Sequence, residues 1–159
     1  MMIVPAVAPD EDPERGRSAE VDENKSTNRL RAKDRRRRRM ALVVDDSEDA
    51  QVVCREVLEA EGFLVQTAPD GCDALDLLID IPAPAIIILD ILMPNMSGLE
   101  LLDIIRAYSR LAETPVLLMT ASDDFPPFPD RHTLFLHKPV DCDALAAGIR
   151  RLLGDSNPA

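Results

Sequence analysis

Carboxylates that follow apolar runs are the side chains in this sequence with the clearest capacity for chemistry. Asp45 and Asp46 come directly after Met40–Val44. Asp90 ends the apolar run that begins at Ile86. A buried carboxylate without a counter-charge is costly, so each of these acids needs a metal, a cation or a reaction. Because oxygen ligands with room for water suit Mg²⁺, we expect the three acids to form a Mg²⁺ site.

Two further side chains would complete a phosphoryl-binding site. Thr120 and Lys138 each follow a later apolar run. Lys138 would supply a positive charge and Thr120 a hydroxyl donor, while Asp90 would act as a nucleophile that forms an acyl phosphate. Taken singly, each of these side chains also fits an ordinary structural role. However, all five side chains fall at strand ends of one fold, which is far less likely by chance and favours a phosphoryl-binding site.

An alternation of strands and helices over residues 40–154 would bring these side chains together. The expected strands are Met40–Val44, Phe63–Thr67, Ile86–Asp90, Pro115–Met119 and Thr133–Leu136. The expected helices run from Glu48 to Glu61, from Asp70 or Gly71 to Asp80, from Ser97 to about Ser109, and from a cap at Asp141 to a stop at Gly154. The alternation predicts an α/β fold with parallel βαβ units, whose strand ends meet at one edge of the sheet.

The link between the fourth and fifth strands departs from this pattern. Pro126, Pro127 and Pro129 fall within four positions, and prolines so close together cannot propagate a helix. We therefore expect this crossover to be a loop, or at most a turn.

The chain begins with a segment of different composition. Residues 1–39 carry 11 Lys and Arg against 8 Asp and Glu, and the other 120 residues carry 7 against 21. Residues 1–39 have almost no large apolar side chains after Val7, which predicts a disordered tail. The run Arg35–Arg39 is either a tether to nucleic acid or anionic lipid, a solvated tail, or an upstream extension if translation begins at Met40. Residues 155–159 are expected to form a short C-terminal tail.

The remaining features exclude some classes of protein. No apolar run approaches the roughly 18 residues that a membrane helix needs, and the N-terminus lacks a signal-peptide pattern, so we expect a cytoplasmic protein. The acidic main domain is a poor nucleic-acid binder. Cys54, Cys72 and Cys142 are too far apart for a metal-binding pair, which favours reduced thiols that are buried or half-buried on helices.

Taken together, the motifs resemble the receiver domain of bacterial response regulators. The matching pieces are Val43–Asp46, Leu89–Pro94, Gly98, Thr120–Ser122 and Lys138–Pro139. The resemblance implies a flavodoxin-like, doubly wound five-stranded parallel sheet of order 2-1-3-4-5, with a fourth helix that the prolines make missing or reduced. It implies that Asp90 accepts phosphate from a histidine kinase or phosphotransfer protein. The implied Mg²⁺ ligands are Asp45, Asp46, Asp90 and the backbone carbonyl oxygen of Leu92.

The resemblance also implies a switch. Thr120 and Lys138 would contact the phosphoryl oxygens, and Phe135 stands at the position of the family's switch aromatic. The peptide bond after Lys138 is expected to be cis. Leu92 and Ser122 flank the phosphorylation site, and their apolar and small side chains predict slow self-dephosphorylation.

The leading interpretation is a stand-alone receiver, because only about five residues follow the last helix. It would catalyse only its own phosphorylation and dephosphorylation, and would act by docking to an effector protein. One alternative is a receiver-like interaction module that no longer switches. Another is a metal-dependent phosphatase with an aspartyl-phosphate, but such enzymes commonly have a second acid two residues after the nucleophile, where this sequence has Leu92.

Overall fold

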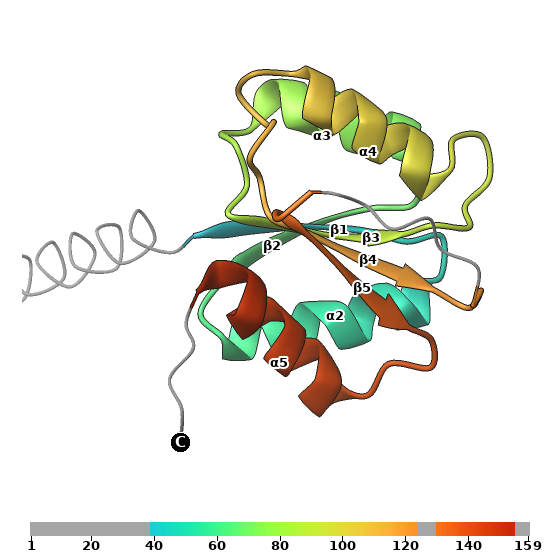
Figure 1. Cartoon of the computed structure of the whole chain (residues 1–159), viewed down its shortest axis with the longest axis vertical. Coiled ribbons are helices and arrows are strands. Elements are labelled where there is room, and N and C mark those ends of the chain that lie inside the picture. Colours follow the sequence, from blue (N-terminus) through green and yellow to red (C-terminus); the bar gives the residue numbers. More distant parts are fainter. Residues whose placement is uncertain (1–38, 124–129, 155–159) are drawn as a thin grey trace, which may run out of the picture. The chain divides into compact units, whose positions relative to one another are not determined.

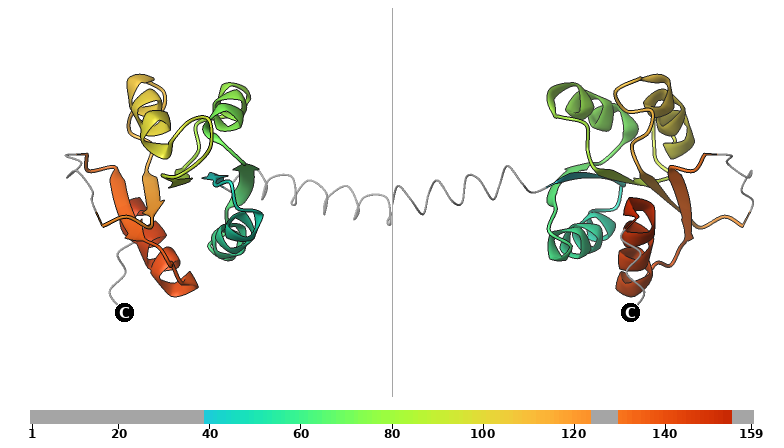
Figure 2. Two further views of the ribbon diagram at one scale, coloured as in Figure 1. Left: turned by 90° about the vertical axis from the view of Figure 1, so that its right-hand side faces the viewer. Right: turned by 60° about the vertical axis from the view of Figure 1, so that its left-hand side comes forward.

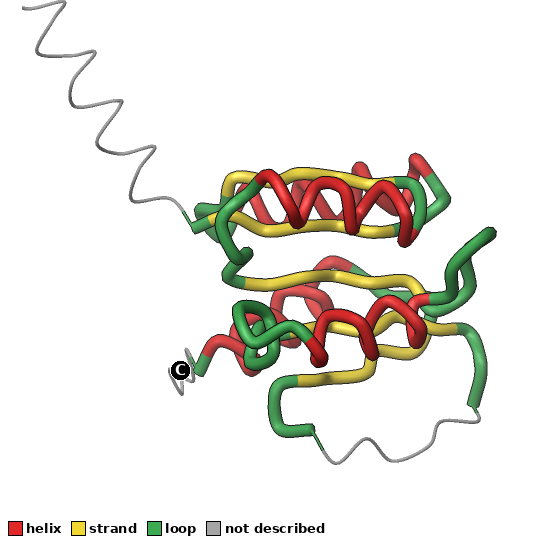
Figure 3. The backbone as a smooth tube through the Cα atoms, turned by 90° about the horizontal axis from the view of Figure 1, so that it is seen from above, coloured by secondary structure: helices red, strands yellow, loops and turns green. Residues whose placement is uncertain are grey.

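The apolar runs of the sequence form the strands of one parallel sheet. In the computed structural model, which describes residues 39–123 and 130–154, the strands are β1 (Met40–Val44), β2 (Leu64–Ala68), β3 (Ile86–Asp90), β4 (Val116–Thr120) and β5 (Thr133–His137). They pair in the order β2-β1-β3-β4-β5, and each pairing is parallel. The predicted sheet order is confirmed, and Figure 3 shows the strands lying side by side.

Helices cover both faces of this sheet (Figures 1 and 2). Among the described residues, α2 (Glu48–Ala60) and α5 (Cys142–Leu153) lie on one face, and α3 (Gly71–Asp80) and α4 (Gly98–Ala107) lie on the other. A separate apolar cluster fills the space on each side. All five residues of β3 are buried, which explains its unbroken apolar run, because a central parallel strand is covered on both faces.

Each helix begins at a polar side chain that caps its first turn. The four caps are Ser47, Asp70, Ser97 and Asp141, and each side chain accepts a hydrogen bond from the backbone N–H three residues later. Ser97 and Glu100 form the reciprocal capping box that the sequence predicts. The last helix ends at Gly154, which adopts the left-handed conformation with φ 73°.

Some element bounds differ from the prediction by one or two residues. The strand β2 begins at Leu64 rather than Phe63, because the Phe63 N–H donates to the carbonyl of Leu58 at the end of α2. Similarly, α4 ends at Ala107 rather than Ser109, because Tyr108 has an extended backbone.

The prediction of a missing or reduced fourth helix is corrected by the structure. The described residues contain four helices, and the fourth in chain order is α5, whose apolar side chains cover one face of β4 and β5. Between β4 and β5, the structure describes residues 121–123 and 130–132, and these contain no helix. The Pro-rich residues 124–129 lie outside the described part of the chain.

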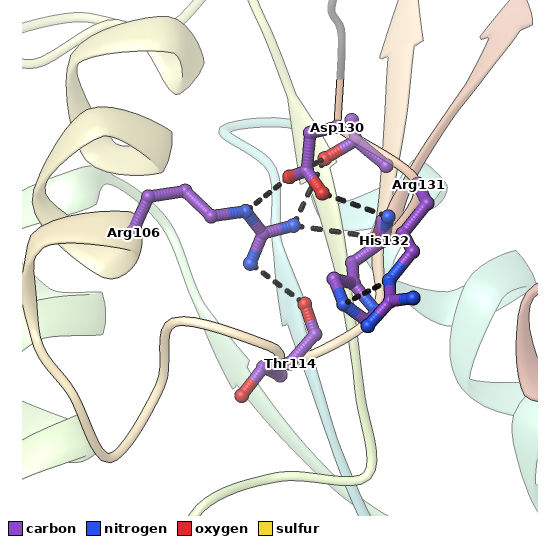
Figure 4. Close-up of polar contacts among 6 residues, drawn as sticks. Arg106, Thr114, Asp130, Arg131 and His132 are labelled. Carbon is purple, nitrogen blue, oxygen red and sulfur yellow. Dashed lines mark hydrogen bonds and ion pairs between the residues drawn. The ribbon is translucent and has the colours of Figure 1, made fainter.

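The amino edge of the sheet is held by a network around Arg106, near the end of α4 (Figure 4). The Arg106 guanidinium pairs with Asp130 and donates to the carbonyl oxygen of Thr114 at 2.8 Å. It also donates to the Thr133 hydroxyl at 2.9 Å and to the His132 carbonyl at 3.3 Å. One side chain therefore ties α4 to the segments that enter β4 and β5.

The described residues test only some of the other predictions. The tail of residues 1–39, with its arginine run, lies outside the described residues except for Arg39. Arg39 stacks over the Phe63 ring with 5.1 Å between its guanidinium carbon and the ring centroid. Residues 155–159 also lie outside. All three cysteines are free, and Cys54 is buried as predicted, but Cys72 and Cys142 are exposed rather than buried or half-buried. Within residues 39–123 and 130–154, no helix has the length and apolar character needed to cross a membrane.

Candidate metal and phosphoryl-binding site

The side chains predicted to meet lie together at the carboxyl edge of the sheet. Asp45 and Asp46 follow β1, Asp90 ends β3, Thr120 ends β4, and Lys138 follows β5. One carboxylate oxygen from each aspartate lies within 4.8 Å of the other two. Asp45 and Asp90 are buried, with 0% and 4% of their surface exposed, whereas Asp46 is exposed. The three carboxylates therefore form a cluster that solvent reaches through Asp46.

Lys138 supplies positive charge to this cluster. Its Nζ lies 3.2 Å from Asp90 Oδ1 and 3.5 Å from Asp45 Oδ2. Burial alone would lower the pKa of Lys138, but the carboxylates of Asp45 and Asp90 outweigh this effect and raise the pKa above its ordinary value. The ammonium group therefore stays charged at neutral pH and bridges the two buried acids.

One lysine does not balance the acids around it. Burial and the neighbouring Asp45 raise the pKa of Asp90 above its ordinary value, although Lys138 and a hydrogen bond from the Leu92 N–H act in the opposite direction. Ionised Asp90 is thus short of positive charge in this cluster. A divalent cation among the three oxygen ligands would supply it, and this donor set suits Mg²⁺.

Asp45 is fixed through both its backbone and its side chain. Its N–H donates to the Ala68 carbonyl at 3.2 Å, and its Oδ1 accepts from the Ser47 N–H at 2.9 Å. Its carbonyl oxygen accepts from Gln51 Nε2 at 2.6 Å. With Lys138 on Oδ2, each polar atom of Asp45 has a partner. The buried acid is held rigidly where β1 ends.

Thr120 links the site to the segment after β5. It is buried, and its Oγ1 accepts a hydrogen bond from the Ser122 N–H at 3.1 Å. Its carbonyl oxygen accepts from the Lys138 N–H at 2.6 Å. The peptide bond between Lys138 and Pro139 is cis, as expected. The backbone contact holds Lys138 beside the end of β4, within reach of the aspartates.

The turn after β3 depends on the absence of a side chain at Gly98, the first residue of α4. A Cβ atom at Gly98 would lie 2.2 Å from the backbone oxygen of Asp90. The Gly98 N–H donates to the Ile91 carbonyl at 2.9 Å and closes the turn. Within it, Asn95 adopts a positive φ of 67°. The chain can therefore return to the end of β3 and start α4 directly beside Asp90.

The predicted switch and flanking residues lie around this cluster. Phe135 is half-buried and packs against the apolar core on the face covered by α3 and α4. Leu92 is 66% exposed, and Ser122 is also exposed. Two contacts were not predicted from the sequence: the Leu92 N–H bond to Asp90 and the Gln51 bond to Asp45. Both contacts involve backbone groups, whose positions cannot be predicted from residue types.

An apolar groove lies next to the site, between α2 and the start of α5. Its apolar lining includes Val53, Met119, Val140 and Leu145, and Lys138 also borders it. Cys54 lies in the same lining, where burial and the nearby Asp45 raise its pKa to about 12. Its thiol is therefore neutral and unreactive at neutral pH.

Several known proteins are similar to this chain in sequence. The sequence model described as the response regulator receiver domain matches residues 41–150. The transcriptional regulatory protein CpxR of Escherichia coli strain K12 is 40% identical over 80 residues, which cover 50% of this chain and 32% of CpxR. The response regulator MprA of Mycobacterium sp. strain KMS is 32% identical over 121 residues, covering 74% of this chain and 51% of MprA.

Solved structures agree with the sequence matches. The chemotaxis response regulator CheY4 of Vibrio cholerae superposes with a TM-score of 0.64 and is 28% identical. The alignment covers 73% of this chain and 99% of CheY4. The curated relatives are longer, and this chain spans 32% of the length of CpxR and 51% of the length of MprA.

Proposed function

Because the chain belongs to the response regulator receiver domain family, we propose that it accepts a phosphoryl group on Asp90 and signals through the resulting change in charge. The observation that carries this proposal is the position of Lys138 Nζ, 3.2 Å from Asp90 Oδ1 and inside a cluster of three carboxylates. A nucleophilic carboxylate, a fixed positive charge and a cation-binding acid pair are the parts that phosphoryl transfer to aspartate requires.

In the proposed reaction, a carboxylate oxygen of Asp90 attacks the phosphorus of a phosphohistidine on a histidine kinase or a phosphotransfer protein. The new O–P bond forms as the P–N bond breaks, and the leaving imidazole takes a proton from solvent. Lys138 then pairs with a phosphoryl oxygen, and the Thr120 hydroxyl donates to another. The burial of Asp90 and Thr120 supports this assignment, because charge stabilisation is strongest away from water.

The proposed Mg²⁺ ligands are Asp45, Asp46, Asp90 and the backbone carbonyl oxygen of Leu92. When bound, Mg²⁺ would neutralise charge on the phosphoryl oxygens. The raised pKa of Asp90 supports the assignment, since the cluster as it stands disfavours a fully ionised state. Exposed Asp46 gives the ion access from solvent.

The proposed output is a shift between two states of the domain. Thr120 would move toward the phosphoryl group, and Phe135, whose packing is only partial, would turn inward behind it. An effector protein would bind the two states with different affinity. A cytoplasmic location is part of this proposal. Nucleic-acid binding is expected only through Arg35–Arg39, because the charged side chains among the described residues are mainly acidic.

The lifetime of the acyl phosphate depends on the side chains beside it. Leu92 is apolar and Ser122 is small, so neither holds a charged group that would activate water at phosphorylated Asp90. We expect slow self-dephosphorylation. It is measured as the loss of label from the protein after the phosphate donor is removed. A half-life of seconds in the presence of Mg²⁺ would contradict this expectation.

The experiment that tests the proposed function is incubation with labelled acetyl phosphate, with Mg²⁺ or with EDTA. The wild type should take up label only with Mg²⁺, and Asp90→Ala should take up none. Label on both proteins would place the acceptor elsewhere. Label on neither would favour an interaction module that no longer switches. Hydrolysis of a phosphomonoester under the same conditions would favour a phosphatase.

A further inference from the structure

Gln51, in the first turn of α2, reaches into the backbone beneath the acid cluster. Its Nε2 donates to the carbonyl oxygen of Asp45 at 2.6 Å and lies 3.4 Å from the carbonyl oxygen of Ala68. The Asp45 N–H donates to that same Ala68 carbonyl at 3.2 Å. One side-chain amide therefore joins the carboxyl ends of the neighbouring strands β1 and β2.

The shorter of these bonds acts on the link between two acids. The Asp45 carbonyl belongs to the peptide unit that joins Asp45 to Asp46, and this unit is planar. A hydrogen bond that fixes the carbonyl oxygen therefore fixes the direction in which the chain leaves toward Asp46. The Asp45 side chain is held independently of Gln51, by a hydrogen bond from the Ser47 N–H and an ion pair with Lys138. Asp46 is exposed, so the direction of its backbone limits where its carboxylate can reach.

We propose that Gln51 is a positioning residue for the Mg²⁺ site, acting through the Asp45–Asp46 peptide unit rather than by touching the ion. This inference rests on the proposed Mg²⁺ binding by Asp45 and Asp46. Without the Gln51 amide, the peptide unit that leads to Asp46 is less restrained, and the Asp46 ligand oxygen must then be ordered when the ion binds. The cost appears as a weaker affinity for Mg²⁺. Partners that orient metal ligands typically contribute tenfold or more to affinity.

The competing explanation is that Gln51 merely fastens α2 to the sheet. The chain offers a matched control for that role, because Arg55 lies one helical turn later and its guanidinium donates to the Thr67 hydroxyl at 3.2 Å. Thr67→Val removes this α2–β2 hydrogen bond without changing shape or charge. Gln51→Met removes the Asp45 bond, again without changing the charge and with a side chain of similar length.

The test is calorimetric titration of Mg²⁺ into the full-length wild type, Gln51→Met and Thr67→Val, with urea unfolding in EDTA measured for each. We expect the Kd for Mg²⁺ to rise about tenfold in Gln51→Met and by less than about twofold in Thr67→Val. Equal Kd values for wild type and Gln51→Met would overturn the inference, whatever the change in stability. If the wild type itself binds no Mg²⁺, the proposed metal site fails and the inference fails with it.

A second measurement needs no variant, should Gln51→Met fold poorly. In ¹⁵N-labelled wild type, the side-chain amide signals of Gln51 should shift during a Mg²⁺ titration with the same apparent Kd as the backbone amide of Asp46. Side-chain signals of Gln51 that stay unchanged while the Asp46 amide responds would overturn the inference, because the hydrogen bond would then be indifferent to the metal.

Discussion

The Lys138 Nζ lies 3.2 Å from Asp90 Oδ1, so the ammonium group that follows β5 is paired with the carboxylate that ends β3. The same nitrogen lies 3.5 Å from Asp45 Oδ2. Two buried acids from neighbouring strands thus share one lysine, whose side chain is 31% exposed. This relationship links the stability of the domain to its chemistry, because any change in charge on Asp90 alters the balance at Lys138.

Lys138→Met should destabilise the protein in the absence of Mg²⁺. It leaves Asp45 and Asp90 buried without a cation. We expect this to lower the free energy of unfolding by about 2 kcal/mol, less than for a fully buried pair because Lys138 is partly exposed. Addition of Mg²⁺ should restore more stability to this variant than to the wild type. Urea unfolding with and without Mg²⁺ measures both effects.

Arg150→Met is the control for that experiment, because Arg150 pairs with Glu61 at the surface. It should change the free energy of unfolding far less and should leave the effect of Mg²⁺ unaltered. Equal losses in the two variants would mean that the Lys138 pairs behave as ordinary surface ion pairs.

Gly98→Ala should destabilise the protein by about 2 to 3 kcal/mol, because the new Cβ meets the backbone oxygen of Asp90, which cannot move without displacing the site. Gly71→Ala is the matched control, since Gly71 also begins a helix. The Cβ of that variant would lie 2.8 Å from the Sδ of Met96, a flexible side chain. Thermal unfolding of both variants checks this, and an equal loss in the two would show that the close approach at Asp90 is easily relieved.

The Arg106–Asp130 network predicts a dependence of stability on pH. Burial alone would raise the pKa of Asp130, but hydrogen bonds from the His132 N–H, the Thr133 hydroxyl and Arg106 lower it below its ordinary value. A carboxylate with a lowered pKa in the folded state stabilises the fold at pH values above its unfolded pKa. That stabilisation is lost as the pH falls through the folded value.

Asp130→Asn should therefore cost about 1 kcal/mol at pH 7, with a difference from the wild type that shrinks below about pH 4. Urea unfolding at several pH values measures this difference. Asp123→Asn is the control, because the Asp123 side chain is 95% exposed and pairs with His137 at the surface. A difference for Asp130→Asn that stays constant from pH 7 to pH 3 would contradict the assignment.

The sequence predicted the fold because its signals are local and agree with one another. Caps such as Ser97 and the apolar run of β3 mark the elements, and parallel strands bring their carboxyl ends to one edge. For the same reason Asp45, Asp90 and Lys138 could be placed together in advance.

The contacts that were not predicted from the sequence depend on packing between elements that are distant in the chain. Gln51 has the character of a solvated helix residue, and its partners are backbone carbonyls of β1 and β2 that are defined only once α2 has docked. Arg106 likewise meets Asp130, 24 residues away, through the approach of α4 to the start of β5. Such bonds follow from the fold and are not visible in residue types.

Phosphorylation of Asp90 is tested most directly by locating the phosphoryl group by mass. The wild type is treated with acetyl phosphate and Mg²⁺, digested under acidic conditions that preserve acyl phosphates, and mapped by tandem mass spectrometry. We expect the added mass of one phosphoryl group on the peptide that contains Asp90, and no addition when EDTA replaces Mg²⁺. A phosphoryl group on another peptide, or none on any peptide, would contradict this expectation.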